Sequence, residues 1–247
     1  MSRPADPNAR AALIAAARKE FWRHGIKKAR IEDITTSSGL SKGAFYLHFE
    51  SKEALFRELV SQLSEGMDAL VERRFREEHA FFERSGSLKK RERQTGSKRL
   101  KEIEVMSRRN DLEVLELLWS HRDVAHVLLN GAQGTEFEGV LWAMVDREIK
   151  RVGESCERLK KWGVCRPDVP SELMGTMLIG SWLLLLRRMT SLSEKPNLES
   201  WLHGLSRLLE NGITGRPAEL VPVLAPPANV SNSRRRSAPR PRLRSLP

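Results

Sequence analysis

The sequence predicts an all-α protein, and three observations support this prediction. Alternating runs rich in Val, Ile and Thr, which are typical of strands, are absent from the 247 residues. Apolar residues instead recur every three or four positions over most of the chain, as they do on the buried face of a helix. Residues that favour helix ends, such as Ser or Asp before a helix and Gly after it, border several of these segments.

The N-terminal segments are short and clearly bounded. Asp6 and Pro7 form a typical helix start, with Asp as the N-cap and Pro at the first helical position. Gly25 is expected to stop this helix. A second helix is predicted over residues 31–38, and Gly39 ends it because glycine accepts the left-handed conformation that a helix C-terminus needs.

The stretch "GLSKGAFYLHF", residues 39–49, predicts a short helix with two different faces. Ser41 caps this helix, and Leu40 can form a hydrophobic staple with Phe45. Phe45 and Phe49 lie one turn apart, so they share a face that should pack on the preceding helices. The opposite face begins with small residues that could approach the floor of a DNA major groove. Two short helices joined by a glycine turn are the helix-turn-helix pattern, and the alternative is a plain corner of an all-α protein.

Residues 9–60 resemble the N-terminal domain of the tetracycline-repressor (TetR) family of bacterial regulators. The matching residues are "FWRHG", Ile34 and "SSGLSKGAFYLHFESKEALF". The resemblance implies a three-helix DNA-binding domain followed by a helical domain for ligand binding and dimerisation. Together with the pattern above, it leads us to expect DNA contacts, to base edges or phosphates, from Arg30, Lys42, Gly43, Ala44, Tyr46, Leu47, His48 and Lys52.

The second helix departs from the family pattern. Family members usually carry a threonine that caps this helix, whereas Ala29 and Arg30 stand there in this chain. Loss of the cap costs about 1 kcal/mol, although Arg30 can still bind phosphate. Thr35 and Ser38 stand where the family often has alanine.

Four parts are expected along the chain. They are an N-terminal arm at 1–8, the DNA-binding domain at 9–55, a regulatory and dimerisation domain at 56–214, and a basic tail at 215–247. Ser51 should cap a long helix that runs from about Lys52 into the seventies or eighties, and this helix joins the two domains.

The later helices are predicted from apolar spacing. The charged stretch 83–109 indicates a loop, a solvated helix, or both. Helical spacing resumes at Leu112, and further helices are expected at about 135–162, 171–190 and 198–213.

The helix at 171–190 is apolar on nearly all sides, so it must be covered all round. Gly175 and Gly180 would allow another helix to approach closely. We expect this helix and the one at 198–213 to pair with a second copy, since two-fold dimers are the commonest oligomers. Such a dimer would set two recognition helices about 34–36 Å apart, one turn of DNA. The alternatives are a core helix within one subunit and a membrane-surface helix, and the second lacks a basic amphipathic face.

A ligand pocket is expected among the helices between Leu112 and Trp162, with apolar walls and a few polar side chains. The candidate lining residues are Trp119, His121, His126, Asn130, Phe137, Trp142, Met144 and Val145. For each of them the simpler interpretation is ordinary core. His121 and His126 lie five positions apart, which does not suit two metal ligands on one helix face, so neither metal nor cofactor is predicted.

The formal net charge of +11 indicates an anionic partner, but much of it is local. Six arginines and no acidic residue fall in 220–247, within a segment rich in Pro and Ser that predicts disorder. This tail either strengthens non-specific DNA binding through counterion release or simply solubilises the chain end.

The chain has only two cysteines, Cys156 and Cys165, so we expect no structural disulfides. No secretory signal is recognisable at the N-terminus, and we therefore expect a bacterial cytoplasmic, nucleoid-associated protein. The two thiols could sense oxidants, although buried, inert thiols are more usual. The longest apolar run, 173–186, is shorter than the roughly 20 residues that cross a bilayer.

The expected function is a dimeric transcription regulator, in particular a repressor that leaves a palindromic operator when a small, apolar effector binds. Two alternatives remain: a ligand-independent DNA-binding or interaction protein that uses the basic tail, and a helical enzyme. We expect no enzyme, because the chain shows no Gly-rich phosphate loop, metal-ligand spacing or nucleophile motif.

Overall fold

A computed structural model describes residues 7–89, 91–92 and 96–213. The chain divides into two units, Met1–Arg216 and Pro217–Pro247, and every described residue belongs to the first. The expected basic tail at 215–247 therefore lies outside the described residues, as do residues 1–6 of the expected N-terminal arm.

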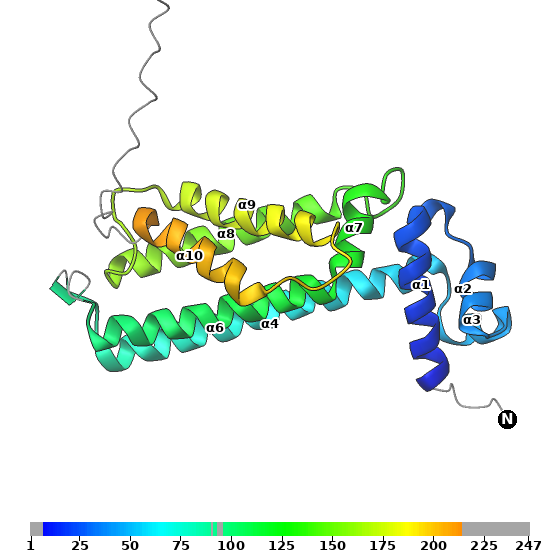
Figure 1. The fold of residues 1–247 in the computed structure, drawn as a ribbon, viewed down its shortest axis with the longest axis horizontal. Coiled ribbons are helices and arrows are strands. Elements are labelled where there is room, and N and C mark those ends of the chain that lie inside the picture. The colour runs from blue at the N-terminus through cyan, green and yellow to red at the C-terminus, as the bar shows by residue number, and fades with distance from the viewer. Residues whose placement is uncertain (1–6, 90, 93–95, 214–247) are drawn as a thin grey trace, which may run out of the picture. The chain divides into compact units, whose positions relative to one another are not determined.

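The described residues form helices and no strands, which confirms the predicted all-α class. The first three helices are α1 (Pro7–Lys28), α2 (Ile31–Ser38) and α3 (Lys42–His48), and they lie beside the N-terminal end of α4 (Figure 1). The helices that follow are α4 (Lys52–Ser85), α6 (Lys98–Ser120), α7 (Arg122–Asn130), α8 (Val140–Lys161), α9 (Ser171–Met189) and α10 (Leu198–Ile213).

Local sequence features fix the ends of the short helices as predicted. Gly39 adopts the left-handed conformation, with φ of 71°, and caps α2. The Ser41 hydroxyl accepts a hydrogen bond from the Ala44 amide at 3.1 Å and so caps α3. Ser51 does the same for α4, and Gly25, with φ of 68° and ψ of 173°, interrupts α1 three residues before its end.

Two predicted boundaries need correction or detail. The helix expected from about residue 135 begins only at Val140, because Gly134 and Gly139 have φ values of 69° and 80° and hold the preceding residues in turns. The charged stretch 83–109 contains both a loop and a helix, since α4 ends at Ser85 and α6 begins at Lys98.

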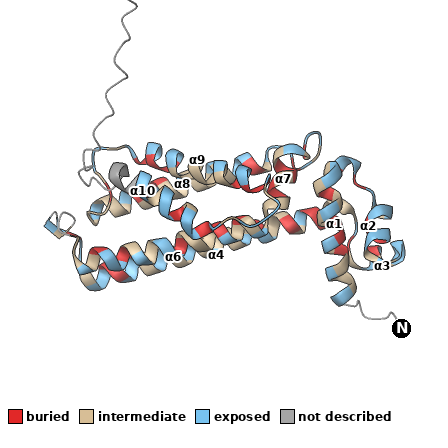
Figure 2. Ribbon diagram, viewed as in Figure 1, coloured by how far each residue is buried: buried red, intermediate tan, exposed pale blue. Residues whose placement is uncertain are grey.

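The buried residues recur along the helices, on the sides that face neighbouring helices (Figure 2). One apolar cluster joins α1, α2, α3 and the first half of α4 to α7 and to Phe137. A second cluster joins α6, α9 and α10. The core of the first four helices is therefore continuous with residues of α7 and of the segment that follows it.

Helix α9 packs mainly along α8. A Cβ atom on Gly175 would lie 2.6 Å from the Ile149 carbonyl oxygen, so the predicted close helix approach at Gly175 is confirmed. Gly180 has no atom of the described residues within 4 Å of a Cβ position, so this close approach does not occur there within one chain. Among the described helices, none combines the length and the apolarity that crossing a bilayer requires.

Candidate nucleic-acid interface and regulatory cavity

Helix α3 presents two chemically different faces. Phe45 and Phe49 are buried in the shared apolar cluster, with ring centroids 5.7 Å apart, so the prediction that this face packs inward is confirmed. Tyr46 and Leu47 point the other way, with 57% and 66% of their surface exposed. The other predicted DNA contacts on α3 are exposed or half-buried: Lys42, Gly43, Ala44 and His48.

An ion pair connects α3 to the start of α2. The ammonium of Lys42 contacts the carboxylate of Glu32, and this hydrogen bond lowers the pKa of Glu32 below its ordinary value. Arg30, the N-cap residue of α2, is exposed and makes no side-chain cap, as its sequence position predicted. Glu32 and Asp33 occupy the first turn instead, where carboxylates interact favourably with the helix dipole.

Lys52 has a structural role that the sequence did not indicate. Its ammonium donates hydrogen bonds to the carbonyls of Lys27 and Ala29 at 3.2 and 2.8 Å. These carbonyls belong to the end of α1 and the turn after it, so Lys52 ties the start of α4 to this turn. The expected phosphate contact of Lys52 stays a prediction.

A contact between α1 and α7 joins the N-terminal helices to the later part of the chain, and the sequence did not predict it. The Arg18 guanidinium donates to both carboxylate oxygens of Asp123, at 2.5 and 2.6 Å, and to the Ser120 carbonyl at 2.6 Å. One helical turn later, Trp22 stacks on His126 with ring centroids 4.0 Å apart. Burial lowers the pKa of this imidazole.

The two backbones touch at the end of the same contact. The Ile26 amide donates to the Gly131 carbonyl at 3.2 Å, and a Cβ atom on Gly25 would lie 2.9 Å from that oxygen. Phe56 on α4 also packs edge-on against Phe137, at 4.9 Å between centroids. A shift of α7 would therefore be transmitted to α1 by direct contact, and a shift of the segment after α7 would be transmitted to α4 through Phe137.

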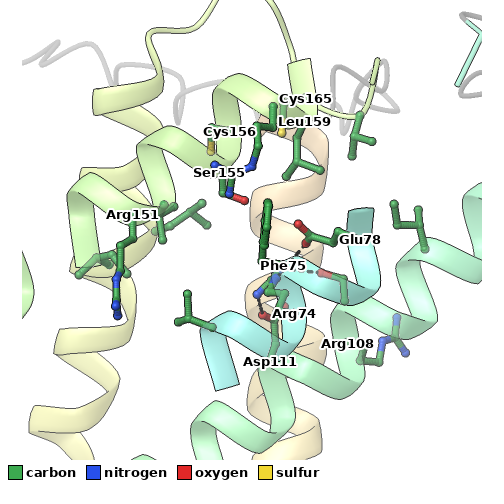
Figure 3. Close-up of a pocket in the computed structure, with 18 of the residues that line it drawn as sticks. Arg74, Phe75, Glu78, Arg108, Asp111, Arg151, Ser155, Cys156, Leu159 and Cys165 are labelled. Carbon is green, nitrogen blue, oxygen red and sulfur yellow. Dashed lines mark hydrogen bonds and ion pairs between the residues drawn. The ribbon is translucent and has the colours of Figure 1, made fainter. Parts of the chain in front are cut away.

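A cavity of about 510 Å³ lies among α4, α6, α8, α9 and α10 (Figure 3). Apolar side chains form much of its wall, among them Phe75, Ile103, Leu178 and Trp182. Its size falls within the range of about 300–1,000 Å³ that small-molecule sites occupy.

Most charged groups in the cavity wall already have partners. The Arg74 guanidinium donates to Glu78, Asp111 and Ser107 at 3.1, 2.6 and 2.9 Å. Burial alone would lower the pKa of Arg74, but the two carboxylates together raise it. The guanidinium of Arg74 therefore already uses its donors in hydrogen bonds within the protein.

Arg158 differs from Arg74. Its guanidinium carbon lies 4.6 Å from the centre of the Phe75 ring, a cation–π contact. Its Nε is buried without a hydrogen-bond partner, and no carboxylate within the described part of the chain forms an ion pair with it. Arg158 can therefore offer donors to a bound molecule.

None of the eight predicted pocket residues lines this cavity. His126 and Phe137 lie in the contacts with α1 and α4 described above, and Trp142 is 57% exposed on α8. Four others take part in local packing or backbone hydrogen bonds, namely Trp119, His121, Asn130 and Met144, and Val145 is half-buried on α8. The actual lining comes from five helices that are far apart in sequence, and periodicity within one helix cannot show which of them converge.

Comparison with known proteins agrees with the N-terminal geometry. A family model described as bacterial regulatory proteins, tetR family, matches residues 13–59. The HTH-type transcriptional regulator TtgR of Pseudomonas putida is 36% identical over 62 residues, which are 25% of this chain and 30% of that protein. A probable acrEF/envCD operon repressor of Escherichia coli is 40% identical over 47 residues, 19% of this chain and 21% of that protein. The match thus spans less than a third of these curated relatives.

Solved structures extend the similarity to the whole fold. A transcriptional regulator from Aquifex aeolicus aligns over 81% of this chain and 99% of its own, with a TM-score of 0.55 and 18% identity. NalD, the secondary repressor of the MexAB-OprM multidrug efflux pump in Pseudomonas aeruginosa, aligns over 83% of this chain and 96% of its own, with a TM-score of 0.57 and 19% identity. At these identities the likeness shows the fold, an N-terminal helix-turn-helix domain followed by a helical domain.

Proposed function

Residues 13–59 make this chain a member of the tetR family of bacterial regulatory proteins, and on this premise we propose that it is a dimeric DNA-binding regulator without enzymatic activity. It acts in the bacterial cytoplasm, associated with the nucleoid, as a repressor that a small molecule releases from a palindromic operator. The observation that carries the proposal is the outward side of α3, where Lys42, Gly43 and Tyr46 are exposed while Phe45 and Phe49 anchor the helix.

The N-terminal half of α3 is the part that enters the major groove. Gly43 and Ala44 are small enough to let the backbone approach the base edges, and Ala44 can contact a thymine methyl group. Lys42 reaches guanine or a phosphate once it leaves Glu32. The Tyr46 hydroxyl and the His48 imidazole suit phosphate oxygens, which fix the register of the helix on the duplex.

The dimer forms through the uncovered side of α9. Leu173, Met177 and Leu184 are 50%, 56% and 65% exposed, and they follow one another at helical spacing. Trp142 on the neighbouring α8 is 57% exposed as well. Water-exposed apolar side chains in such a row favour burial against a second copy, and two-fold symmetry would present two α3 helices to one operator.

The effector occupies the cavity among α4, α6, α8, α9 and α10. It is an apolar molecule, and Arg158 provides the donors for an acceptor group on it. Helix α4 lines the cavity from Val71 to Glu78 and begins beside α3 at Lys52, so it is the lever between the two sites. The effector releases DNA only if it binds more tightly to the conformation whose α3 helices no longer fit successive grooves.

Selection of bound sites from random DNA duplexes tests this function. The wild-type chain should enrich a two-fold symmetric motif, and Lys42→Ala should relax the preference at one position in each half-site and cost about 1–3 kcal/mol. Tyr46→Phe, which removes only the hydroxyl, should weaken binding evenly across sequences. Binding that is indifferent to sequence, or unchanged in both variants, would contradict the proposal.

A further inference from the structure

Cys156 and Cys165 are the two cysteines of the chain, and the fold brings them into one wall of the cavity. They belong to one small buried cluster, with 3% and 6% of their surface exposed, together with Met174 of α9. Figure 3 shows both at the end of α8, facing the cavity from the same side. Neither takes part in the proposed release of DNA by an apolar effector.

The end of α8 explains why residues nine positions apart meet. Gly163 has φ of 74° and reverses the chain; its amide donates to the Lys160 carbonyl at 3.0 Å, and the Val164 amide donates to the Leu159 carbonyl at 2.8 Å. This is the Schellman type of helix end, in which the chain folds back over the last turn. Cys165 is thereby returned to the helical turn that carries Cys156.

The two thiols are chemically unequal. A hydrogen bond from the Cys165 thiol lowers the pKa of Cys156, against the opposing effect of burial, and the charges of Lys160 and Arg74 lower it further. The same hydrogen bond and burial raise the pKa of Cys165. One thiol thus ionises more readily while its neighbour keeps a proton, which is the arrangement of an attacking and a resolving cysteine.

We propose that Cys156 and Cys165 form a reversible disulfide when a small hydroperoxide enters the cavity, which makes this wall an oxidant-sensing site. The Cys156 thiolate attacks the peroxide, the O–O bond breaks, and a sulfenic acid and an alcohol, or water, result after one proton is taken up. The Cys165 thiol then attacks the sulfenic sulfur, a disulfide forms and water leaves. The two thiols are oxidised by two electrons and the peroxide is reduced.

Disulfide formation must change the shape of this wall. It brings the two sulfur atoms to about 2 Å, closer than a thiol hydrogen bond allows. The turn at 163–165 is thereby pulled toward α8, and Met174, which packs with both cysteines, must adjust on α9. Because α8 and α9 line the cavity and carry the proposed dimer surface, the disulfide shifts the same equilibrium as the effector. Only this last step rests on the proposed function.

The disulfide is tested on the reduced full-length chain, titrated with hydrogen peroxide and analysed by mass spectrometry. Trypsin separates the cysteines, since Arg158, Lys160 and Lys161 lie between them, so a linked pair of peptides that dithiothreitol splits is the expected product. Thiols that iodoacetamide still alkylates after unfolding, or links only between chains, would overturn the proposal.

Variants test the order of attack. Cys165→Ser keeps a hydroxyl that donates to Cys156, whereas Cys165→Ala does not. Dimedone, which traps sulfenic acids, should therefore label Cys165→Ser faster than Cys165→Ala, and label Cys156→Ser least. Circular dichroism confirms that each variant is folded, and equal labelling of all three would overturn the role of Cys156.

Measurements of operator binding distinguish a failure of this proposal from a failure of the proposed function. With the motif selected above, the disulfide form should bind about 5–150-fold more weakly than the reduced form, the usual range of coupling between sites. Peroxide should leave Cys156→Ser unaffected. Equal affinities of the two forms would overturn the sensing consequence. Absence of sequence-specific binding by the reduced chain would refute the proposed function instead. Formation of the disulfide would still be supported by mass spectrometry.

Discussion

At the scale of single residues, the ion pair between Lys42 and Glu32 means that Glu32 competes with DNA for Lys42 on the proposed DNA-binding surface. The lysine must leave a carboxylate before it can bind DNA, and that carboxylate then faces the duplex. We predict that Glu32→Gln tightens operator binding several-fold, because it frees Lys42 and removes a repelling charge, and that log affinity falls more steeply with log salt, by about one unit. Fluorescence anisotropy across a salt series measures both effects.

The matched control for this change is Glu199→Gln, which removes an exposed carboxylate on α10. Its operator affinity and salt dependence should equal those of the wild type, because α10 packs on α6 and not on the DNA-binding helices. An equal gain in both variants would mean that only net charge matters.

The imidazole of His126 predicts a pH dependence of stability. Burial lowers its pKa in the folded chain, so between that value and the ordinary value of about 6.5 the unfolded chain binds more protons. Acidification from neutral pH through this window should therefore lower the free energy of unfolding. His126→Phe keeps a ring against Trp22 and should lose part of this dependence in urea titrations, whereas His203→Gln, at an exposed site, should retain it.

Arg158 should determine which molecules the cavity prefers. We predict that decanoic acid raises the unfolding temperature more than decanol, and decanol more than decyltrimethylammonium, because the guanidinium lacks a carboxylate partner within the described residues. Arg158→Met keeps the apolar stem and should remove the preference for the acid. An unchanged order of the three probes in this variant would show that Arg158 does not face the ligand.

At the scale of elements, the close packing of α8 against α9 depends on the absence of a side chain at Gly175. Gly175→Ala places a Cβ atom 2.6 Å from the Ile149 carbonyl, so the helices must separate, and we expect a loss of about 1–3 kcal/mol. Gly204→Ala on α10, with no described atom within 4 Å, should instead add about 0.5–1 kcal/mol, as alanine does within a helix. Urea unfolding distinguishes the expected loss of stability in Gly175→Ala from the expected gain in Gly204→Ala. A stabilising Gly175→Ala would contradict the close contact.

At the scale of the whole molecule, dimerisation and DNA binding should be lost together. Met177→Glu places a charge in the apolar row of α9, and we predict a monomer in sedimentation velocity with a much weaker operator complex. Val105→Glu, at a 69% exposed position on α6, is the control and should stay dimeric. A dimeric Met177→Glu would place the interface elsewhere.

The sequence predicted most of the N-terminal part because its determinants are local. Ser41 and Ser51 cap the helices that follow them, and Gly39 ends the helix before it, within three or four residues of chain. The regulatory part could not be predicted to the same depth. Its cavity needs Phe75, Leu178 and other residues from helices that meet only in three dimensions. The contact of α1 with α7 likewise depends on a tertiary arrangement that no periodicity encodes.

The apolar cluster shared by α1–α4 and α7 bears on how such proteins can be recombined. The hydrophobic interior around Phe21 and Phe56 is completed by Val124, Val127 and Phe137. Part of the core of the N-terminal helices is therefore supplied by residues that come later in the sequence. A chimera that grafts residues 9–63 onto the body of a relative would leave that interior open on one side. Transplanting 122–141 with them restores it, and the exchangeable module is therefore discontinuous in sequence.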